Sequence, residues 1–288
     1  MLSGAVELLQ CPACGEGLEQ GEGTLRCPAG HSFDIARQGY VSLFAGGGRA
    51  GEADTVAMVE AREAFLAAGH YARLSEALAE QGRALAEQGR TAAGGAVVDL
   101  GAGTGYHLAR VLDALPEHTG LALDASSAAL RRAARAHPRA AAVGADVWQQ
   151  LPLRDGTAAL ILSVFAPRNP TEMARVLAPG GSLLAVTPTT RHLYELVGPL
   201  GLLSVPEDKA GRLDEQLASR FGLTERRSVE HPMFLNREEA AQLVRMGPSA
   251  WHVDERAIEE RLAALPDPLT VTASVTLSRY VRGDKRSG

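Results

Sequence analysis

The sequence predicts an α/β fold in which a small metal-binding module precedes a Rossmann-like domain with a parallel sheet. Three observations predict it. All three cysteines fall within the first 31 residues, together with a histidine. An apolar stretch at 96–100 leads directly into a glycine-rich turn and a helical pattern. Further apolar stretches then alternate with helical segments, as in doubly wound sheets. A length of 288 residues accommodates about two such domains.

The composition excludes several other classes of protein. Hydrophobic residues make up 45% of the chain and charged residues 22%, which suits a packed globular core and not a disordered chain. The longest nearly unbroken apolar run covers 158–166, far short of the ~20 residues of a membrane span. Residues 1–10 contain no basic residue, so we expect no secretory signal and a cytoplasmic protein. The net charge of −5 indicates no general attraction to polyanions.

The cysteines and the first histidine form a motif typical of structural zinc sites. Cys11, Cys14, Cys27 and His31 follow the spacing C-x2-C-x12-C-x3-H. Three thiolates and one imidazole complete a tetrahedral set with no open position, so we predict a Zn²⁺ ion that folds the module. The alternatives are three free thiols, or one disulfide with a spare cysteine, although disulfides are rare in cytosolic proteins.

We expect this zinc-binding module to span 1–45, with strands at 32–35 and 40–44 packing on the metal loops. Glycines in 46–53 predict a linker. The second domain, 54–288, is expected to begin with a helical pair: one helix capped by Asp54 and ending before Gly69, and another over about 72–88.

The turn after the 96–100 strand carries the main functional signal. Glycines at 101, 103 and 105 let the backbone approach a ligand, and the following helix offers its N-terminal amides. The next strand, 120–124, ends in Asp124, where a carboxylate can accept hydrogen bonds from ribose hydroxyls. We therefore expect a ribonucleoside. Tyr106 follows the last glycine, so the third glycine of the dinucleotide fingerprint is missing, and no P-loop is present. A purely structural turn is the alternative.

Asp99 followed by the glycine turn resembles the first motif of class I S-adenosylmethionine-dependent methyltransferases. Asp146, after a strand at 140–143, falls where that class contacts adenine; otherwise it is a loop acid. A strand at 158–162 and the Pro-Gly-Gly turn within 176–187 resemble the same class. Helical segments at 193–203 and 213–221 and two antiparallel strands, 223–235 and 269–277, complete the expected sheet.

Motifs across nearly the whole chain resemble one family, the 23S ribosomal RNA (guanine-N1)-methyltransferases of the RlmA type. The resemblance is strongest to the Gram-positive branch that includes the tylosin-resistance methyltransferase. Its marks are 27–41, 64–71, 164–169 and 246–252. It implies methyl transfer from S-adenosylmethionine to N1 of a guanine in a 23S rRNA hairpin loop, at the macrolide-binding peptide exit tunnel. In that branch the modification contributes to resistance to tylosin-like macrolides.

The resemblance also implies site residues. It gives the same zinc ligands and adds Tyr71 and His192 as cofactor contacts. The expected cofactor-binding residues are Tyr71, Asp99, Gly101, Gly103, Thr104, Gly105, Asp124, Asp146 and His192. On their own, Tyr71 is more often a core aromatic and His192 a surface histidine.

Arg168 and Asn169 follow the fourth strand, where this class meets its target base, and Arg168 can hydrogen-bond guanine O6. A tight turn explains them equally well. A splayed base can stack on Phe165 or Trp251. A homodimer is a further expectation. Two other functions stay open at this point: a small-molecule methyltransferase of secondary metabolism, and a non-catalytic zinc-dependent RNA-binding protein.

Overall fold

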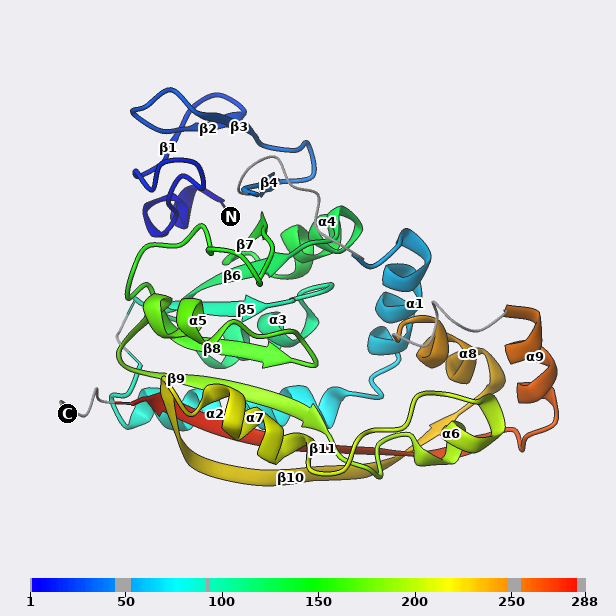
Figure 1. Ribbon diagram of the computed structural model, residues 1–288. Helices are drawn as coiled ribbons and strands as arrows, with labels where there is room; N and C mark the ends of the chain where they lie inside the picture. The colour runs from blue at the N-terminus through cyan, green and yellow to red at the C-terminus, as the bar shows by residue number, and fades with distance from the viewer. Residues whose placement is uncertain (1, 45–52, 92–93, 248–254, 284–288) are drawn as a thin grey trace.

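The computed structural model describes residues 2–44, 53–91, 94–247 and 255–283, and its centre is an eight-stranded sheet (Figure 1). The strand order is β10-β11-β9-β8-β5-β6-β7-β4. The strands are β4 (Tyr40–Ser42), β5 (Ala96–Leu100), β6 (Thr119–Asp124), β7 (Ala140–Gly144), β8 (Ala158–Val164), β9 (Leu177–Pro188), β10 (Phe221–Leu235) and β11 (Leu269–Arg282).

The six strands from β9 to β4 run parallel, whereas β11 is antiparallel to β9 and β10. The chain order reverses between β5 and β8, because β5, β6 and β7 progress to one edge while β8 and β9 progress to the other. Such a switch point leaves a crevice outside the carboxyl ends of the strands, where ligands bind. The sheet topology therefore places the candidate site before any side chain is considered.

Helices cover both faces of the sheet. They are α1 (Val56–Ala67), α2 (Ala72–Glu87), α3 (Tyr106–Ala114), α4 (Ser127–Ala136), α5 (Pro170–Val176), α6 (Tyr194–Leu200), α7 (Lys209–Leu217), α8 (Arg237–Arg245) and α9 (Glu255–Ala263). Leucines of α2 and α3 form one core with β5, β6 and β8, whereas α5 and α7 contribute to the core on the opposite face. A third cluster joins α1, α6, α8 and α9 to the far ends of β10 and β11.

The N-terminal module contains two short 3-10 helices, η1 (Leu2–Gly4) and η2 (Val6–Leu8), and a separate antiparallel sheet of β1 (Glu19–Gln20), β2 (Thr24–Arg26) and β3 (Ser32–Asp34). It lies against the β7 end of the large sheet (Figure 1). Its buried Leu9 and Leu25 belong to the same core as Leu151 and Leu153. Backbone hydrogen bonds reinforce this contact, since the Arg154 amide donates to the Leu8 carbonyl at 3.0 Å. The module is thus packed on the larger domain.

One local expectation from the sequence is incomplete and another is wrong. The strand at 40–44 shares a core with Cys11 and Cys27 of the metal loops, but β4 also pairs in parallel with β7 and becomes the edge of the large sheet. Gly144 permits this pairing, because a Cβ there would lie 3.1 Å from the Ser42 backbone. The cap of α1 is Thr55, whose side chain accepts from the Met58 amide, while Asp54 pairs with Arg62 instead.

Most of the remaining elements match the sequence analysis. The helix expected at 213–221 lies earlier, at Lys209–Leu217, because Phe221 begins β10. Helices α8 and α9 were not expected; α8 begins with a capping box between Asn236 and Glu239. The linker residues 46–52 and Trp251 lie outside the described residues. Within the described part of the chain, we find no helix long and apolar enough to cross a membrane.

Candidate functional site: a metal cluster and a cleft at the carboxyl edge

The four predicted metal ligands converge in the N-terminal module. The ligand atoms of Cys11, Cys14, Cys27 and His31 all lie within 4.8 Å of one another. Cys14 Sγ lies 3.7 Å from Cys27 Sγ, and His31 Nδ1 lies 3.3 Å from Cys27 Sγ and 3.6 Å from Cys11 Sγ. Tetrahedral zinc with Zn–S of ~2.3 Å and Zn–N of ~2.0 Å sets ligand atoms roughly 3.5 to 3.8 Å apart. The three distances above lie close to this range, and the widest separation in the set exceeds it by about 1 Å, so the four residues fit Zn²⁺ after a small inward movement of their side chains.

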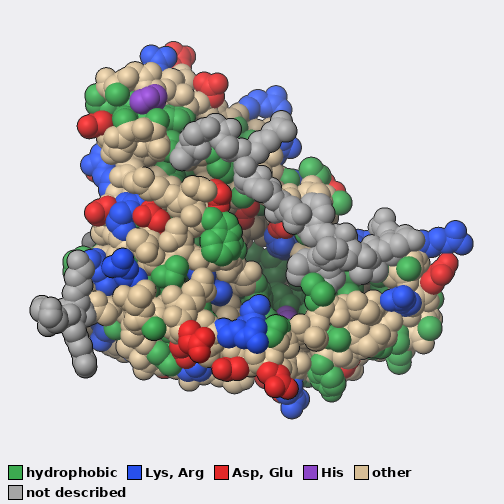
Figure 2. All heavy atoms as spheres, in the orientation of Figure 1, with side chains coloured by type: hydrophobic (Ala, Val, Ile, Leu, Met, Phe, Trp, Pro, Cys, Tyr) green, Lys and Arg blue, Asp and Glu red, His purple; other side chains and the backbone are tan. Residues whose placement is uncertain are grey.

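A cleft of about 850 Å³ opens at the carboxyl ends of β5, β6, β7, β8 and β9. Its other wall comes from α1, α8 and the segment leading into α6, and Figure 2 shows the hollow on this face. Of the predicted cofactor-binding residues, eight line it: Tyr71, Asp99, Gly101, Gly103, Thr104, Asp124, Asp146 and His192. Residues as far apart in the sequence as 71 and 192 thus meet in a single cavity.

The glycine turn is held against the end of β6 by Asp124. Its carboxylate oxygens accept hydrogen bonds from the backbone amides of Gly103 and Ser126, both at 2.8 Å. Gly101 has a φ of +72°, and a Cβ there would come within 2.7 Å of the Ala166 Cβ. The turn can therefore form only with glycine at this position. Asp124 both orders the turn and presents its carboxylate to the cleft.

Gly105 is used differently from the other glycines. It has a φ of +78° and immediately precedes α3. A Cβ would lie 2.9 Å from the Ala136 Cβ and 3.2 Å from the Ala133 Cα, both on or next to α4. Gly105 does not line the cleft. Its absent side chain lets α3 and α4 approach each other, so its position supports packing and not direct cofactor contact.

The acidic residues near the glycine turn, Asp99, Asp124 and Asp146, differ in environment. Asp99 is only 2% exposed, and burial, with a smaller contribution from Asp124, raises its pKa to about 7. Burial also raises the pKa of Asp124, while its two amide donors oppose that shift. Asp146 lies at the end of β7 and its Oδ1 accepts the Trp148 amide at 2.9 Å. A cationic ligand in the cleft would favour the ionised form of Asp99.

Tyr71, Phe165 and His192 form a ring cluster on the β8 side of the cleft. The Tyr71 hydroxyl lies 3.2 Å from His192 Nε2, and the Phe165 ring centroid lies 6.1 Å from Tyr71 and 5.6 Å from His192. Burial lowers the pKa of His192 to about 4, so the imidazole is neutral at physiological pH. Burial raises the pKa of the Tyr71 hydroxyl, which stays protonated.

The structure separates the two weak catalytic candidates. Arg168 lines the cleft, and one of its terminal nitrogens donates to the Val186 carbonyl at 3.1 Å. Its buried Nε has no hydrogen-bond partner among the described residues. Asn169 instead caps α5 by accepting the Glu172 amide and donates to the Trp148 carbonyl. Arg168 is therefore part of the cleft wall, whereas the side chain of Asn169 caps a helix.

Two cleft residues escaped the sequence analysis. Arg62 pairs with Asp54, donates to the Met246 carbonyl at 2.8 Å and passes beside Gly103. A hydrogen bond of 2.8 Å joins His107 Nδ1 to the Ser75 hydroxyl. Burial, together with the nearby charge of Arg62, lowers the pKa of His107 to about 4. Arg62 had one signal in the sequence, because it falls between Met58 and Leu66 at the four-residue spacing of a buried helical stripe.

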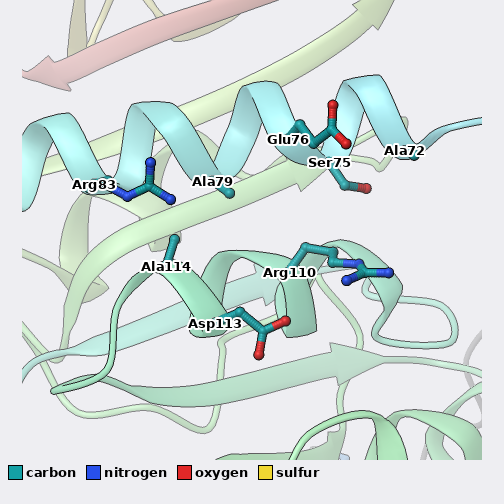
Figure 3. Close-up of a pocket in the computed structure, with 8 residues that line it drawn as sticks. All are labelled: Ala72, Ser75, Glu76, Ala79, Arg83, Arg110, Asp113 and Ala114. Atoms are coloured by element: carbon teal, nitrogen blue, oxygen red, sulfur yellow. The ribbon is translucent and has the colours of Figure 1, made fainter.

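A second cavity, of about 300 Å³, lies between α2 and α3 (Figure 3). Its charged residues are Glu76, Arg83, Arg110 and Asp113. None of the predicted cofactor-binding residues lines it. The larger cleft at the switch point is therefore the candidate active site.

Comparisons with known proteins agree with this geometry. Residues 9–45 match the family described as "RlmA, N-terminal", and residues 97–181 match "Methyltransferase domain". A chain in a Haloferax volcanii complex of the methyltransferase activator Trm112 with a methyltransferase is 19% identical, with a TM-score of 0.51 over 82% of this chain and 100% of that one. That likeness shows the fold. The fold and the two sites define a class I S-adenosylmethionine-dependent methyltransferase with an N-terminal zinc ribbon, whose cofactors are S-adenosylmethionine and Zn²⁺.

Two full-length relatives identify the family. A protein of Micromonospora griseorubida named among the 23S rRNA (guanine-N1)-methyltransferases is 53% identical over 94% of this chain and 96% of its own length. The 23S rRNA (guanine(748)-N1)-methyltransferase of Streptomyces fradiae is 50% identical over 96% of this chain and 98% of its own. The chain belongs to the 23S rRNA (guanine-N1)-methyltransferases. The two other functions left open by the sequence are not favoured.

Proposed function

We propose that this protein transfers the methyl group of S-adenosylmethionine to N1 of one guanine in a hairpin loop of 23S rRNA, at the macrolide-binding peptide exit tunnel. The observation that carries the proposal is the alignment of Asp146, Asp124 and the glycine turn along β7, β6 and β5, directly beside the ring cluster. The relative in Streptomyces fradiae is named for guanine 748, and the proposed target is the same guanine.

The order of these groups gives the cofactor a direction in the cleft. Asp146 at β7 suits the adenine, Asp124 at β6 suits the ribose hydroxyls, and the turn after β5 suits the amino-acid end. When bound, S-adenosylmethionine supplies a methyl group on a positively charged sulfur. Asp99 beneath the turn favours that cation, and Arg62 beside Gly103 offers a partner for its carboxylate.

The remaining cleft residues act on the guanine. Transfer forms the bond from N1 to the methyl carbon, breaks the carbon–sulfur bond and releases the N1 proton. Negative charge develops on O6 as that proton leaves, so a fixed donor near O6 lowers the barrier. Arg168 lines the β8 side of the cleft, so its guanidinium suits this role.

Transfer of a tritiated methyl group to unmodified 23S rRNA tests the proposal. N1 methylation blocks base pairing, so reverse transcription should stop one nucleotide before the modified guanine. Asp124→Ala serves as the matched variant, because it removes both the ribose acceptor and the tie to Gly103. Label incorporated into a small molecule and not into RNA would contradict the proposal. An unchanged cofactor affinity in Asp124→Ala would contradict the assignment of that residue to the ribose.

The proposal has two biological consequences. Because its substrate would be ribosomal RNA, we expect the protein in the cytoplasm. Modification at the tunnel is expected to contribute to resistance to tylosin-like macrolides, which growth of an expressing strain on tylosin would measure. The homodimer expected from the sequence stays a prediction. Sedimentation velocity of the purified protein tests for that dimer.

A further inference from the structure

Phe165 has a backbone conformation that bulky residues rarely adopt. Its φ is +54°, and it is one of three non-glycine residues with a positive φ in the described part of the chain. The left-handed region is unfavourable for a large side chain, and such residues cluster where the strain serves a function. The Phe165 amide donates to the Val186 carbonyl at 3.3 Å, which holds the residue at the end of β8.

Burial does not explain this conformation. The Phe165 side chain is 41% exposed, although the same residue type at position 65 is fully buried in the core. A strained backbone that presents a partly exposed ring to a cleft stabilises the free protein little. The arrangement points to a ligand that covers the ring.

The sheet order indicates which ligand covers the Phe165 ring. The proposed adenine, ribose and amino-acid positions follow β7, β6 and β5 in turn, and β8 is the next strand in the sheet, so a methyl acceptor would approach from the β8 side. Phe165 immediately follows β8 and lines the same cleft. The ring therefore lies on the side from which the methyl acceptor approaches, away from the positions assigned to the adenine and the ribose.

The neighbours of Phe165 keep its ring in place. Tyr71 and His192 contact it with interplanar angles of 43° and 32°, and the two are tied to each other through the hydroxyl and Nε2. Because His192 Nδ1 accepts the Ser274 amide, this pair is itself anchored to β11. A ring held in this way offers its free side as a fixed platform.

We propose that Phe165 is the platform on which the target guanine stacks after leaving its loop, with N1 toward the methyl group. This inference rests on the proposed function and adds a positioning residue to it. Stacking of a base on an aromatic ring suits a flat acceptor whose edge must stay free for chemistry. Arg168, three residues later, then reaches the O6 edge of the stacked base.

Three substitutions test the platform: Phe165→Tyr keeps a ring, Phe165→Leu keeps an apolar side chain, and Phe165→Gly relieves the positive φ. Each is assayed for methyl transfer to 23S rRNA and for cofactor affinity by calorimetry. We expect Phe165→Leu and Phe165→Gly to lower kcat/KM for RNA by about 10- to 100-fold, the range for loss of one base–aromatic stack. Phe165→Tyr is expected to stay within about threefold of the wild type, and the cofactor Kd of all three is expected to change less than about threefold.

Thermal unfolding separates a positioning role from a structural one. Glycine tolerates the observed φ, so Phe165→Gly should unfold within about 2 °C of the wild type despite losing the ring. Phe234→Leu is the matched control, because Phe234 is an exposed phenylalanine on β10 outside the cleft, and its kcat/KM should not change.

The outcomes distinguish this inference from the proposed function. Full activity of Phe165→Leu on an RNA that the wild type methylates would overturn the platform and leave the proposed function intact. Loss of cofactor affinity in step with activity would also overturn it, since the ring would then belong to the cofactor site. Failure of the wild type to methylate 23S rRNA would instead refute the proposed function.

Discussion

The Nε2 atom of His192 lies 3.2 Å from the hydroxyl oxygen of Tyr71, across 121 residues of sequence. The direction of this hydrogen bond is fixed, because His192 Nδ1 accepts the backbone amide of Ser274 at 3.1 Å. A neutral imidazole that accepts at Nδ1 carries its proton on Nε2. His192 therefore donates to Tyr71, and the hydroxyl proton of Tyr71 is left for an acceptor in the cleft.

Tyr71→Phe removes that donor without changing the ring. If Tyr71 contacts the cofactor, its loss should raise the Kd for S-adenosylmethionine by about 3- to 10-fold, the usual effect of one neutral hydrogen bond. The pKa of about 4 keeps His192 neutral, so calorimetry should give the same ratio to wild type at pH 6 and pH 8. Tyr194→Phe, on an exposed tyrosine outside the cleft lining, is the control. A ratio that collapses at pH 6 would mean that His192 becomes protonated in this range and is not held neutral.

Asp99→Asn should change stability and cofactor binding in opposite directions. The folded pKa of Asp99 is raised to about 7, so its ionisation disfavours the folded state, and stability falls as the pH rises from about 4 through 7. The ligand-free variant should therefore be more stable than wild type at pH 8, by roughly 1–4 kcal/mol, and the gain should shrink toward pH 4. Urea unfolding across this range measures it. The same variant should bind S-adenosylmethionine more weakly at pH 8, and tighter binding would refute the role of the carboxylate.

Gly105 and Gly94 form a matched pair for the packing role of the glycine turn. Their φ angles are +78° and +77°, but a Cβ at Gly105 meets Ala133 and Ala136, whereas nothing lies within 4 Å of one at Gly94. Gly94→Ala should cost about 1–2 kcal/mol for the backbone alone. Gly105→Ala should cost about 1–3 kcal/mol more, because α3 and α4 must move apart. Equal losses in urea unfolding would contradict the close helix contact.

Removal of zinc should affect more than the ribbon. The metal loops, β4 and the 151–154 segment share one core and a set of backbone hydrogen bonds. We expect a strong chelator, or Cys27→Ser, to lower the amide-exchange protection of residues 2–44 and also of β7 and 151–154. Protection of α8 and of the 233–235 end of β10 should stay unchanged, since those residues pack in a separate cluster. If the loss of amide-exchange protection extends no further than β3, the zinc module and the large sheet fold independently.

Asn169→Ala and Arg168→Gln should give opposite profiles. Asn169 caps α5 and holds the Trp148 carbonyl, so its loss should cost about 1 kcal/mol, or about 2–4 °C in Tm, with kcat within about threefold of wild type. Arg168 lines the cleft with an unsatisfied Nε, so Arg168→Gln should lower kcat by about tenfold or more. A loss of kcat greater than about threefold in Asn169→Ala would indicate that Asn169 takes part in catalysis.

The zinc ligands and the nucleotide-binding strands could be predicted without a structure, because both signals are local. Three cysteines and His31 lie within 21 positions, and Asp124 follows the glycine turn at a distance set by one helix and one strand. Residues separated by such short stretches of chain stay close together in the folded protein. The strands β5 to β9 were predictable for the same reason, since each contains a run of at least four consecutive buried residues.

How distant parts of the chain meet became visible only in the folded molecule. There β4 pairs with β7 and extends the large sheet, while its side chains stay in the core of the zinc module. The Asn169 side chain caps a helix, whereas Arg168 lines the cleft. Arg62 lies beside Gly103. The strain at Phe165 and the tautomer of His192 depend on Val186 and Ser274, partners in strands far along the chain. Such contacts follow from sheet order and packing, which no local pattern encodes.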